Sequence, residues 1–310
     1  MERTLLYALI IVLFLNCDKK TSKEAFLSQS DNLQPVSLSN QKNKLIKNTM
    51  VVAHRGDWRN APENSLQAVQ NCIAMGVDMV EIDLKQTKDS VIVVMHDKTL
   101  ERTSTGTGLV KDHEYDSIKN LFLKNGYGMP TEQRIPTLEE VLKLCKGKIL
   151  VFLDKGYPYV PKIMSIAQNL NMQNQLFIEG RHHYQKVKSQ YGEILKDRNY
   201  MPRVKVNNDT LAFQNYVAPF LKSNVQIFIC SVDTAKINDA KSFIQKIKTH
   251  NKKIMLTSLW EHTCAGYTDD RAIENPEANW GKIVDLGADL ICTDRPLALL
   301  NYLRSKNRHQ

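Results

Sequence analysis

Short apolar runs alternate with longer amphipathic stretches over most of the chain, from about residue 50 onward. The runs are rich in β-branched residues, as expected for strands buried on both faces. Helical intervals between such strands indicate parallel β–α–β units. The runs are Met50–Ala53, Met79–Leu84, Val91–Met95, Ile149–Leu153, Leu176–Ile178, Val204–Val206, Val225–Ile229, Ile254–Leu256 and Leu290–Cys292.

The length of this alternating region, about 255 residues, is typical of an eight-stranded (β/α) barrel, or TIM barrel. We therefore predict an α/β chain with one (β/α)8 barrel over residues 49–305 and a short tail at 306–310. The region contains nine such runs, one more than an eight-stranded barrel needs. We expect the surplus run to be Val204–Val206 or Val225–Ile229. A doubly wound open sheet is the alternative, but no glycine-rich phosphate loop follows the first run.

Three of the intervals have a clear helical pattern, namely Ser65–Met75, Thr137–Cys145 and Ala235–Thr249. Thr137 and Glu140 have the spacing of a capping box, in which each side chain bonds the backbone amide of the other residue. A helix is therefore predicted to begin directly after Thr137.

The first 48 residues differ from the rest. Arg3 precedes an apolar run from Leu5 to Leu15, which is too short to span a bilayer but suits the apolar core of a secretory signal. The sequence ending in Cys17 resembles a bacterial lipoprotein signal, in which the cysteine receives the lipid. We expect residues 1–16 to be a lipoprotein-type signal peptide and residues 17–48 to be a flexible tether. The protein would then be an exported cell-envelope lipoprotein, facing the periplasm or the cell surface; an ordinary signal peptide or an uncleaved anchor is the alternative.

Composition narrows the class of partner. The chain has 42 Lys and Arg against 33 Asp and Glu, a net charge of +9, which points to an anionic partner such as a phosphate ester or a membrane surface. The basic residues are dispersed rather than grouped with stacking aromatics, so nucleic-acid binding is not expected. None of the six cysteines forms a CxxC pair, which argues against a zinc ribbon or a disulfide framework.

Two carboxylates in the second run are the most informative ionisable residues. Functional groups of (β/α) barrels collect at the C-terminal ends of the strands. Glu81 and Asp83 lie two positions apart and point to the same face, while Val80, Ile82 and Leu84 would face the helices. Two adjacent carboxylates inside a barrel require a shared proton or a bound cation. Oxygen ligands favour Ca²⁺ or Mg²⁺ over zinc.

Two histidines follow other runs at the same end of the barrel. His54 comes after the first run and His96 after the third, which suits general acid–base catalysis near neutral pH. Arg55 offers a planar fork that matches phosphate oxygens. Phosphodiester cleavage needs one group to accept a proton from the attacking oxygen and another to donate one to the departing alkoxide. These residues therefore indicate metal-assisted phosphoester chemistry.

The motifs that surround these residues resemble the glycerophosphodiester phosphodiesterase family. They are, in order, Ala53–Asp57, Ala61–Ser65, Gly76–Asp83, His96–Thr103, Ile135–Val141 and Gly287–Pro296. The resemblance runs from about Met50 to Leu303 and is sparse in the middle. It implies a TIM barrel of the phosphodiesterase and phospholipase C-like type, a divalent cation, Ca²⁺ or Mg²⁺, and hydrolysis of glycerophosphodiesters to glycerol 3-phosphate and an alcohol.

The resemblance also implies roles by position. The acid–base pair would be His54 and His96, and the metal ligands would include Glu81 and Asp83. Three further residues complete the motifs: Arg55 would bind phosphate, and Glu63 and Asn64 would support the metal shell or position His54 and the substrate. Residues 98–135 would form an insertion that covers the glycerol side of the site.

Some positions depart from the family pattern, which usually has a glutamate at the end of strand four and a lysine two residues later. Here Asp154 is expected to be the third metal ligand and the adjacent Lys155 to bind substrate. Because neighbouring strand residues face opposite sides, one of them is misassigned or the strand ends at Asp154. Trp260 would stack on a substrate head group, with core packing as the alternative. The segment Arg181–His183 has no family counterpart and is interpreted as a solvated loop.

Other functions remain open at this point. The attacking nucleophile is either water or the neighbouring glycerol hydroxyl of the substrate. The nearer rival function is a phospholipase C- or D-like barrel enzyme that acts on intact lipids. The more distant one is a non-catalytic envelope binding lipoprotein, and the presence of both histidines and both carboxylates speaks against it.

Overall fold

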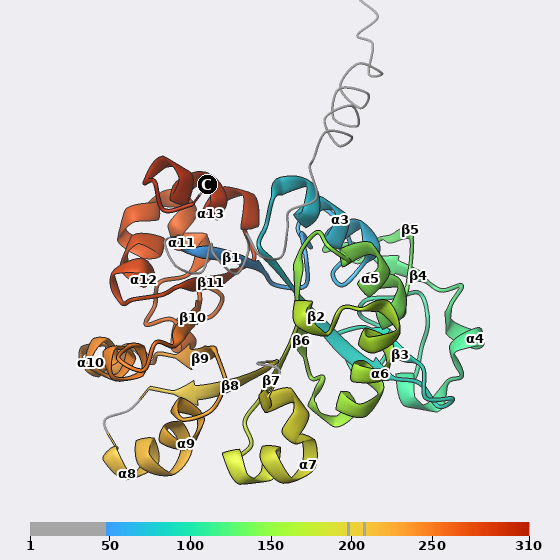
Figure 1. Ribbon diagram of the computed structural model, residues 1–310. Helices are drawn as coiled ribbons and strands as arrows, with labels where there is room; N and C mark the ends of the chain where they lie inside the picture. Colours follow the sequence, from blue (N-terminus) through green and yellow to red (C-terminus); the bar gives the residue numbers. More distant parts are fainter. Residues whose placement is uncertain (1–47, 197–198, 207–208, 310) are drawn as a thin grey trace, which may run out of the picture. The chain divides into compact units, whose positions relative to one another are not determined.

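Eight parallel strands close into a barrel in the computed structural model, which describes residues 48–196, 199–206 and 209–309 (Figure 1). The predicted (β/α)8 barrel is therefore confirmed. The order around the barrel follows the chain, and β1 closes it by pairing with β2 and β11. The barrel strands are β1 (Met50–Ala53), β2 (Met79–Gln86), β6 (Leu150–Asp154), β7 (Leu176–Gly180), β8 (Tyr200–Lys205), β9 (Ile227–Ser231), β10 (Lys253–Thr257) and β11 (Leu290–Thr293).

The surplus apolar run is the third one, so the expectation that it would be Val204–Val206 or Val225–Ile229 was wrong. Those two runs belong to β8 and β9, whereas β3 (Ile92–Val94) lies outside the barrel. It pairs antiparallel with the end of β2, where Leu84 lies opposite Val94 and Gln86 opposite Ile92. Hence β2 is shared, since Met79–Asp83 pair with β6 and the following residues extend into a hairpin.

Helices surround the barrel, and the three predicted helical intervals are confirmed (Figure 1). Ser65 caps the first of them through its side chain, and the capping box of Thr137 and Glu140 is present at the start of the second. The helices are α3 (Leu66–Met75), α4 (Tyr115–Ile118), α5 (Leu138–Cys145), α6 (Val160–Leu170), α7 (Tyr184–Lys196), α8 (Thr210–Ala212), α9 (Ala218–Leu221), α10 (Ile237–Lys248), α11 (Asp269–Glu274), α12 (Lys282–Asp285) and α13 (Pro296–Ser305). Among the described residues, no helix is both long and apolar enough to cross a membrane.

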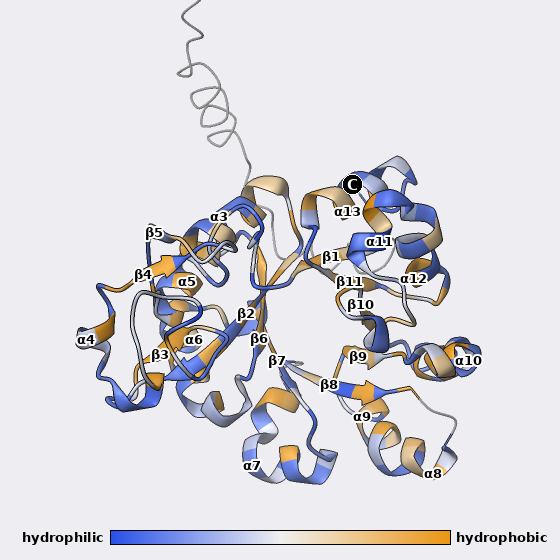
Figure 2. Ribbon diagram, turned by 180° about the vertical axis from the view of Figure 1, so that it is seen from behind, coloured by the Kyte–Doolittle hydropathy of each residue, from blue (hydrophilic) through white to orange (hydrophobic). Residues whose placement is uncertain are grey.

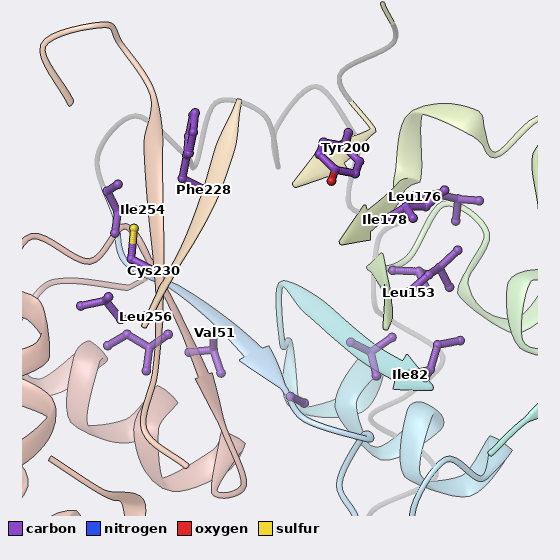
Figure 3. Close-up of a cluster of buried hydrophobic side chains, with 14 of the residues drawn as sticks. Val51, Ile82, Leu153, Leu176, Ile178, Tyr200, Phe228, Cys230, Ile254 and Leu256 are labelled. Atoms are coloured by element: carbon purple, nitrogen blue, oxygen red, sulfur yellow. The ribbon is translucent and has the colours of Figure 1, made fainter. Parts of the chain in front are cut away.

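Strand alternation divides the core into an outer and an inner layer. Outward-facing side chains pack between the strands and the helices, as Figure 3 shows for Val51 of β1, Ile82 of β2 and Leu153 of β6. The helices in turn expose polar faces and bury apolar ones (Figure 2). Inward-facing apolar side chains fill the interior of the barrel below its C-terminal mouth and form the inner layer. They are Met50, Val52, Met79, Leu150, Phe152, Met201, Ile227, Ile229, Met255, Leu290 and Cys292. This apolar layer supports the polar side chains at the C-terminal ends of the strands.

The connection between β2 and β6 carries a small structure of its own, which includes the hairpin of β4 (Phe122–Lys124) and β5 (Pro130–Arg134). A separate apolar cluster holds it together and contains Val93, Leu100, Ile118 and Ile135 among its members. The predicted insertion at residues 98–135 is therefore a folded segment rather than an open loop.

The opposite, N-terminal end of the barrel is tied to the C-terminal residues. The Thr49 amide donates to the Arg308 carbonyl at 2.8 Å, and His309 is buried against the Asp78 carboxylate, also at 2.8 Å. Residues 1–47 contain the predicted signal, Cys17 and nearly all of the predicted tether, and these lie outside the described residues.

Candidate active site

Three carboxylates meet inside the C-terminal mouth of the barrel. Glu81 and Asp83 project inward from β2, and Asp154 projects from the end of β6, where it lies in register with Asp83. One oxygen of each lies within 4.8 Å of the others. Glu81 and Asp83 are almost fully buried, with exposed fractions of 2% and 1%. The structure therefore brings the three predicted carboxylates together, with Glu81 and Asp83 on the same face of β2 as strand alternation predicts.

The position of Lys155 resolves the problem of two adjacent polar residues at the end of β6. The strand ends at Asp154, and Lys155 adopts a left-handed conformation with φ of 57°. That turn brings the lysine back over the mouth, where its ammonium binds Asp83 and lies 3.4 Å from an Asp154 oxygen. A left-handed conformation costs a non-glycine residue about 1–3 kcal/mol, so the surrounding contacts must hold it.

The residues after β1 hold the carboxylates from the other side. Arg55 is also left-handed, with φ of 55°, and its backbone amide donates to Glu81 at 2.7 Å. Gly56 follows with φ of 75°, and a Cβ there would lie 2.8 Å from that of Ala68 on α3, so the tight turn requires glycine. The Asn64 amide donates to Asp83 and its carbonyl accepts from the Asp83 backbone, both at 3.0 Å.

Charge is unevenly distributed among the carboxylates. Burial, together with the charges of Asp83 and Asp154, raises the pKa of Glu81 well above its usual range. Burial also opposes ionisation of Asp83, but Lys155 and then His96 outweigh it and lower the pKa of Asp83 to about 2. The three clustered carboxylates thus share the ammonium group of Lys155, and further positive charge at the cluster would reduce their mutual repulsion.

The carboxylate cluster has the donor chemistry of a divalent-cation site. Its oxygen ligands suit the hard cations Ca²⁺ and Mg²⁺, and none of the described residues adds a sulfur or imidazole ligand to the cluster. The residues therefore fit such a cation.

His54 lies beside the cluster and is oriented by a residue that sequence reasoning did not identify. Its Nδ1 donates to Asp294, directly after β11, at 2.8 Å. The same Asp294 oxygen accepts from Trp58 Nε1 at 2.7 Å. Burial opposes ionisation of Asp294, yet the bonds from His54 and Trp58 lower its pKa. An ionised Asp294 fixes the Nδ1 proton and leaves Nε2 for the substrate.

Asp294 is positioned by a buried carboxylate that the sequence analysis also missed. Asp269 accepts from the Asp294 amide at 2.7 Å and from Thr293, Ser258 and Trp280 side chains at 2.6–2.8 Å. These bonds join the ends of β10 and β11 and fix the backbone beside His54.

His96 has its own carboxylate, the adjacent Asp97, at 2.5 Å from Nδ1. Arg102 of the insertion binds Asp97 at 2.6 Å and Glu63 at 2.7 and 2.8 Å. Glu63 also binds the Arg55 guanidinium at 3.2 Å. Glu63 therefore links two arginines at the rim of the site, while Asn64 contacts the carboxylate cluster directly.

A buried ion pair on β7 and β8 forms the far wall of the site. The Arg203 guanidinium binds Glu179, with Nε at 2.8 Å from the carboxylate. Burial raises the pKa of Glu179 although Arg203 opposes the rise. Across the mouth, the half-exposed Trp260 ring meets His54 edge to face at 5.5 Å between ring centres. Its exposure argues against core packing, the alternative considered for this residue.

Three adjoining cavities open along the mouth. The central one, about 280 Å³, is lined by both histidines, Glu81, Asp154 and Lys155. A second, about 390 Å³, lies under the insertion and shares His54 and Trp260 with the first. A third, about 570 Å³, lies beside β7–β9 and is lined by Arg181 and His183 of the segment interpreted as a solvated loop.

Comparisons with known proteins agree on one family. The model of the glycerophosphoryl diester phosphodiesterase family matches residues 54–298. A glycerophosphodiester phosphodiesterase of Caldanaerobacter subterraneus is 28% identical over 265 residues, which cover 83% of this chain and 98% of that protein. The crystal structure of a glycerophosphoryl diester phosphodiesterase from Parabacteroides distasonis is 26% identical, with a TM-score of 0.69 over 87% of this chain and 93% of that one. A phosphodiesterase of Oleispira antarctica, solved with the product sn-glycerol 3-phosphate, shares the fold at 19% identity, with a TM-score of 0.61 over 83% of this chain and 96% of that one.

Proposed function

The chain belongs to the glycerophosphoryl diester phosphodiesterase family and is a phosphoric diester hydrolase, and we propose that it cleaves glycerophosphodiesters to glycerol 3-phosphate and an alcohol with a divalent cation and two histidines. The observation that supports this proposal best is the arrangement of the central cavity. Carboxylates of the three-membered cluster line this cavity together with two histidines, each bound through Nδ1 to a carboxylate of its own.

Glu81, Asp83 and Asp154 would hold Ca²⁺ or Mg²⁺. When bound, such a cation would supply positive charge to neutralise a phosphate oxygen and would help to orient the diester. Lys155 and Arg55 add positive charge at the same place, because the first contacts Asp83 and Asp154 and the second lies 3.5 Å from Asp83. Asn64 and the Arg55 amide keep the carboxylate oxygens in place through their hydrogen bonds.

The histidines would divide the proton transfers. With Nδ1 engaged by Asp294 or Asp97, each ring has Nε2 available to exchange a proton with the substrate. One histidine accepts the proton of the nucleophile, either water or the neighbouring glycerol hydroxyl, and the other protonates the leaving alkoxide. The bond that breaks joins phosphorus to the alcohol oxygen, so the phosphate stays on glycerol. If the glycerol hydroxyl attacks, the first product is a cyclic phosphate, and water must then open it to give glycerol 3-phosphate.

Release of glycerol 3-phosphate from glycerophosphocholine, measured with a coupled dehydrogenase, tests the proposal. We expect His54→Ala and His96→Ala each to lose at least about 10²-fold in kcat while remaining folded. The control is His250→Ala, which removes an exposed histidine after α10. Turnover near the wild-type level in either site variant removes that histidine from the mechanism.

Chelation and lipid vesicles test the rest of the assignment. Activity should fall with chelator and return with Ca²⁺ or Mg²⁺, and Glu81→Gln should weaken this metal requirement. Inhibition by chelator that is unchanged in Glu81→Gln argues against a metal at Glu81. Faster cleavage of intact phospholipid vesicles than of water-soluble diesters would instead favour a phospholipase.

We also propose that Cys17 carries a lipid that holds the protein at the cell envelope. The support is the sequence alone, in which Arg3 precedes the apolar run Leu5–Leu15 and Cys17 follows it. Metabolic labelling with a fatty acid should mark the wild type and not Cys17→Ser. Equal labelling of both chains, or of neither, would contradict the lipoprotein assignment.

A further inference from the structure

The largest of the three cavities has no role in the chemistry described above. It opens at the C-terminal ends of β7, β8 and β9 and measures about 570 Å³. A cavity of this size accommodates a small-molecule ligand. Its wall combines aromatic rings, Phe213 and Tyr216, with the basic side chains Arg181, Lys205 and His183.

This cavity continues the active site. Arg181, Arg203, Ser231, His262 and Thr263 line both the large cavity and the central one. The central cavity in turn shares His54 and Trp260 with the cavity under the insertion. The three therefore form a row with the carboxylate cluster in the middle. A phosphodiester centred there has two arms, one for each outer cavity.

The cavity under the insertion suits the short glycerol arm of the diester. It is lined by Trp58, Thr103 and Asn125, which offer hydrogen bonds and an apolar ring to a short polyol. The leaving alcohol then extends into the large cavity beside β7–β9.

The large cavity has an excess of positive charge. Within residues 48–196, 199–206 and 209–309, no ion pair engages Arg181 or Lys205, and the side chains of both are exposed to solvent. Arg203 is neutralised by Glu179. Asp233 is the sole carboxylate of the described lining, and its Oδ1 accepts from the Ala235 amide at 3.0 Å. Two unpaired cations thus face one carboxylate.

The wall that presents these cations is held in shape by side-chain contacts. The His183 ring packs edge to face on Tyr216, with 5.3 Å between ring centres. The Tyr216 hydroxyl donates to the Arg203 carbonyl on β8 at 3.2 Å. Phe213 packs edge to face on Phe243 of α10, also at 5.3 Å. The wall of this cavity is therefore held in place by ring packing and a hydrogen bond.

We propose that this cavity is the leaving-group subsite and that it selects alcohols that carry a phosphate of their own. Arginine and lysine are the side chains that bind phosphate best, through a planar fork and a point charge respectively. A choline leaving group would instead meet two cations and a single carboxylate. The inference rests on the proposed hydrolase function and adds a substrate class to it.

A matched pair of substrates tests the subsite with the full chain. Glycerophosphoinositol and glycerophosphoinositol 4-phosphate differ by one phosphate on the leaving alcohol. We expect kcat/KM to be about tenfold higher for the phosphorylated diester, as one or two charged contacts would give. Raising the ionic strength should reduce this preference.

Lys205→Gln is the most diagnostic variant, because Lys205 lines the large cavity and not the central one. It should reduce the preference by about fivefold, because kcat/KM for the phosphorylated diester should fall more than kcat/KM for glycerophosphoinositol. Arg181→Gln should reduce the preference as well, with a loss on both substrates because Arg181 reaches the central cavity. Lys188→Gln, which neutralises an exposed lysine on α7 outside these cavities, is the control.

Equal kcat/KM for the two substrates in the wild type, or a preference that Lys205→Gln leaves intact, would overturn the inference. If neither diester is hydrolysed, the proposed function fails, and titration calorimetry still tests the subsite. Tighter binding of glycerophosphoinositol 4-phosphate, lost in Lys205→Gln and kept in Lys188→Gln, would then support the subsite. Equal binding of the two diesters would refute it.

Discussion

The bond between His54 and Asp294 yields a prediction that depends on Trp58. One Asp294 oxygen accepts from both His54 Nδ1, at 2.8 Å, and Trp58 Nε1, at 2.7 Å. Asp294→Asn keeps the shape of the side chain and removes its charge. A hydrogen bond to a charged group contributes about 1–1.5 kcal/mol more than a neutral one. We therefore expect kcat to fall about tenfold with little change in KM, since a barrier of about 1.4 kcal/mol is a factor of ten.

Trp58 keeps that loss small. If the amide introduced by Asp294→Asn turned its NH₂ group toward the histidine, the Trp58 N–H would lose its acceptor, at a cost of about 1–3 kcal/mol. The carbonyl oxygen of that amide is therefore held toward both rings, and His54 keeps its proton on Nδ1. Among the described residues, His54 and Trp58 are the hydrogen-bond donors to this oxygen, so Trp58→Phe removes the contact that opposes the rotation. The NH₂ group can then donate to Nδ1 and shift the proton to Nε2, which disables the histidine as base and disfavours its protonated form.

The double variant Asp294→Asn, Trp58→Phe should consequently lose far more activity than the product of the single variants. Trp58→Phe alone should keep kcat within about threefold, with any loss confined to KM, because Trp58 lines the glycerol-side cavity. The double variant should lose on the order of 10³-fold, as expected when a catalytic histidine is held in the wrong tautomer. Steady-state release of glycerol 3-phosphate measures all three. Additive losses, about 30-fold or less in the double variant, would refute the reasoning, as would an Asp294→Asn enzyme of wild-type kcat.

Three further predictions concern the rim, the core and the thiols. Arg102→Gln should lower kcat/KM about tenfold, because Asp97 and Glu63 lose their shared partner, and activity within about twofold of wild type would contradict this. Phe152→Ala, inside the barrel, should lower the free energy of unfolding by about 3–5 kcal/mol in a denaturant titration, and a loss below about 1 kcal/mol would show that the inner layer repacks. In a Cys17→Ser chain, Ellman's reagent should modify the cysteines only after unfolding, because burial raises the thiol pKa to about 12 for Cys145, Cys230 and Cys264 and also raises it for Cys72 and Cys292.

The miscounted strand shows what periodicity alone omits. The run at Ile92–Val94 is fully apolar and buried, so its composition resembles that of a barrel strand. The information was in the spacing, because only a few residues separate Leu84 from the third run. A parallel crossover needs a dozen or more residues, whereas an antiparallel hairpin needs two to five. The 18 residues between Val206 and Val225 leave room for the helical crossover that the structure contains.

Site residues could be predicted where one element determined their geometry. Glu81 and Asp83 followed from alternation within β2, and capping by Thr137 followed from local spacing. Asp294 and Asp269 could not be found in that way. The first lies 240 residues from His54 and meets it only because β11 closes the barrel beside β1. Because a closed barrel pairs its first strand with its last, the residues after the last strand are expected beside His54. This expectation was the signal that could have identified Asp294.

At the mouth of the barrel, three residues with a strained backbone are also the ones that contact the buried carboxylates. Arg55, Asn64 and Lys155 all have positive φ, and each contacts one of the buried carboxylates through its amide or side chain. The left-handed turns are what bring these groups within reach of Glu81 and Asp83. Their strain and the repulsion among the carboxylates both oppose folding, and the apolar layer below offsets them. Substitution at any of the three residues should therefore change cation affinity and stability together, whereas substitution of inner-layer residues that do not line the central cavity, such as Val52 and Met79, should change stability alone.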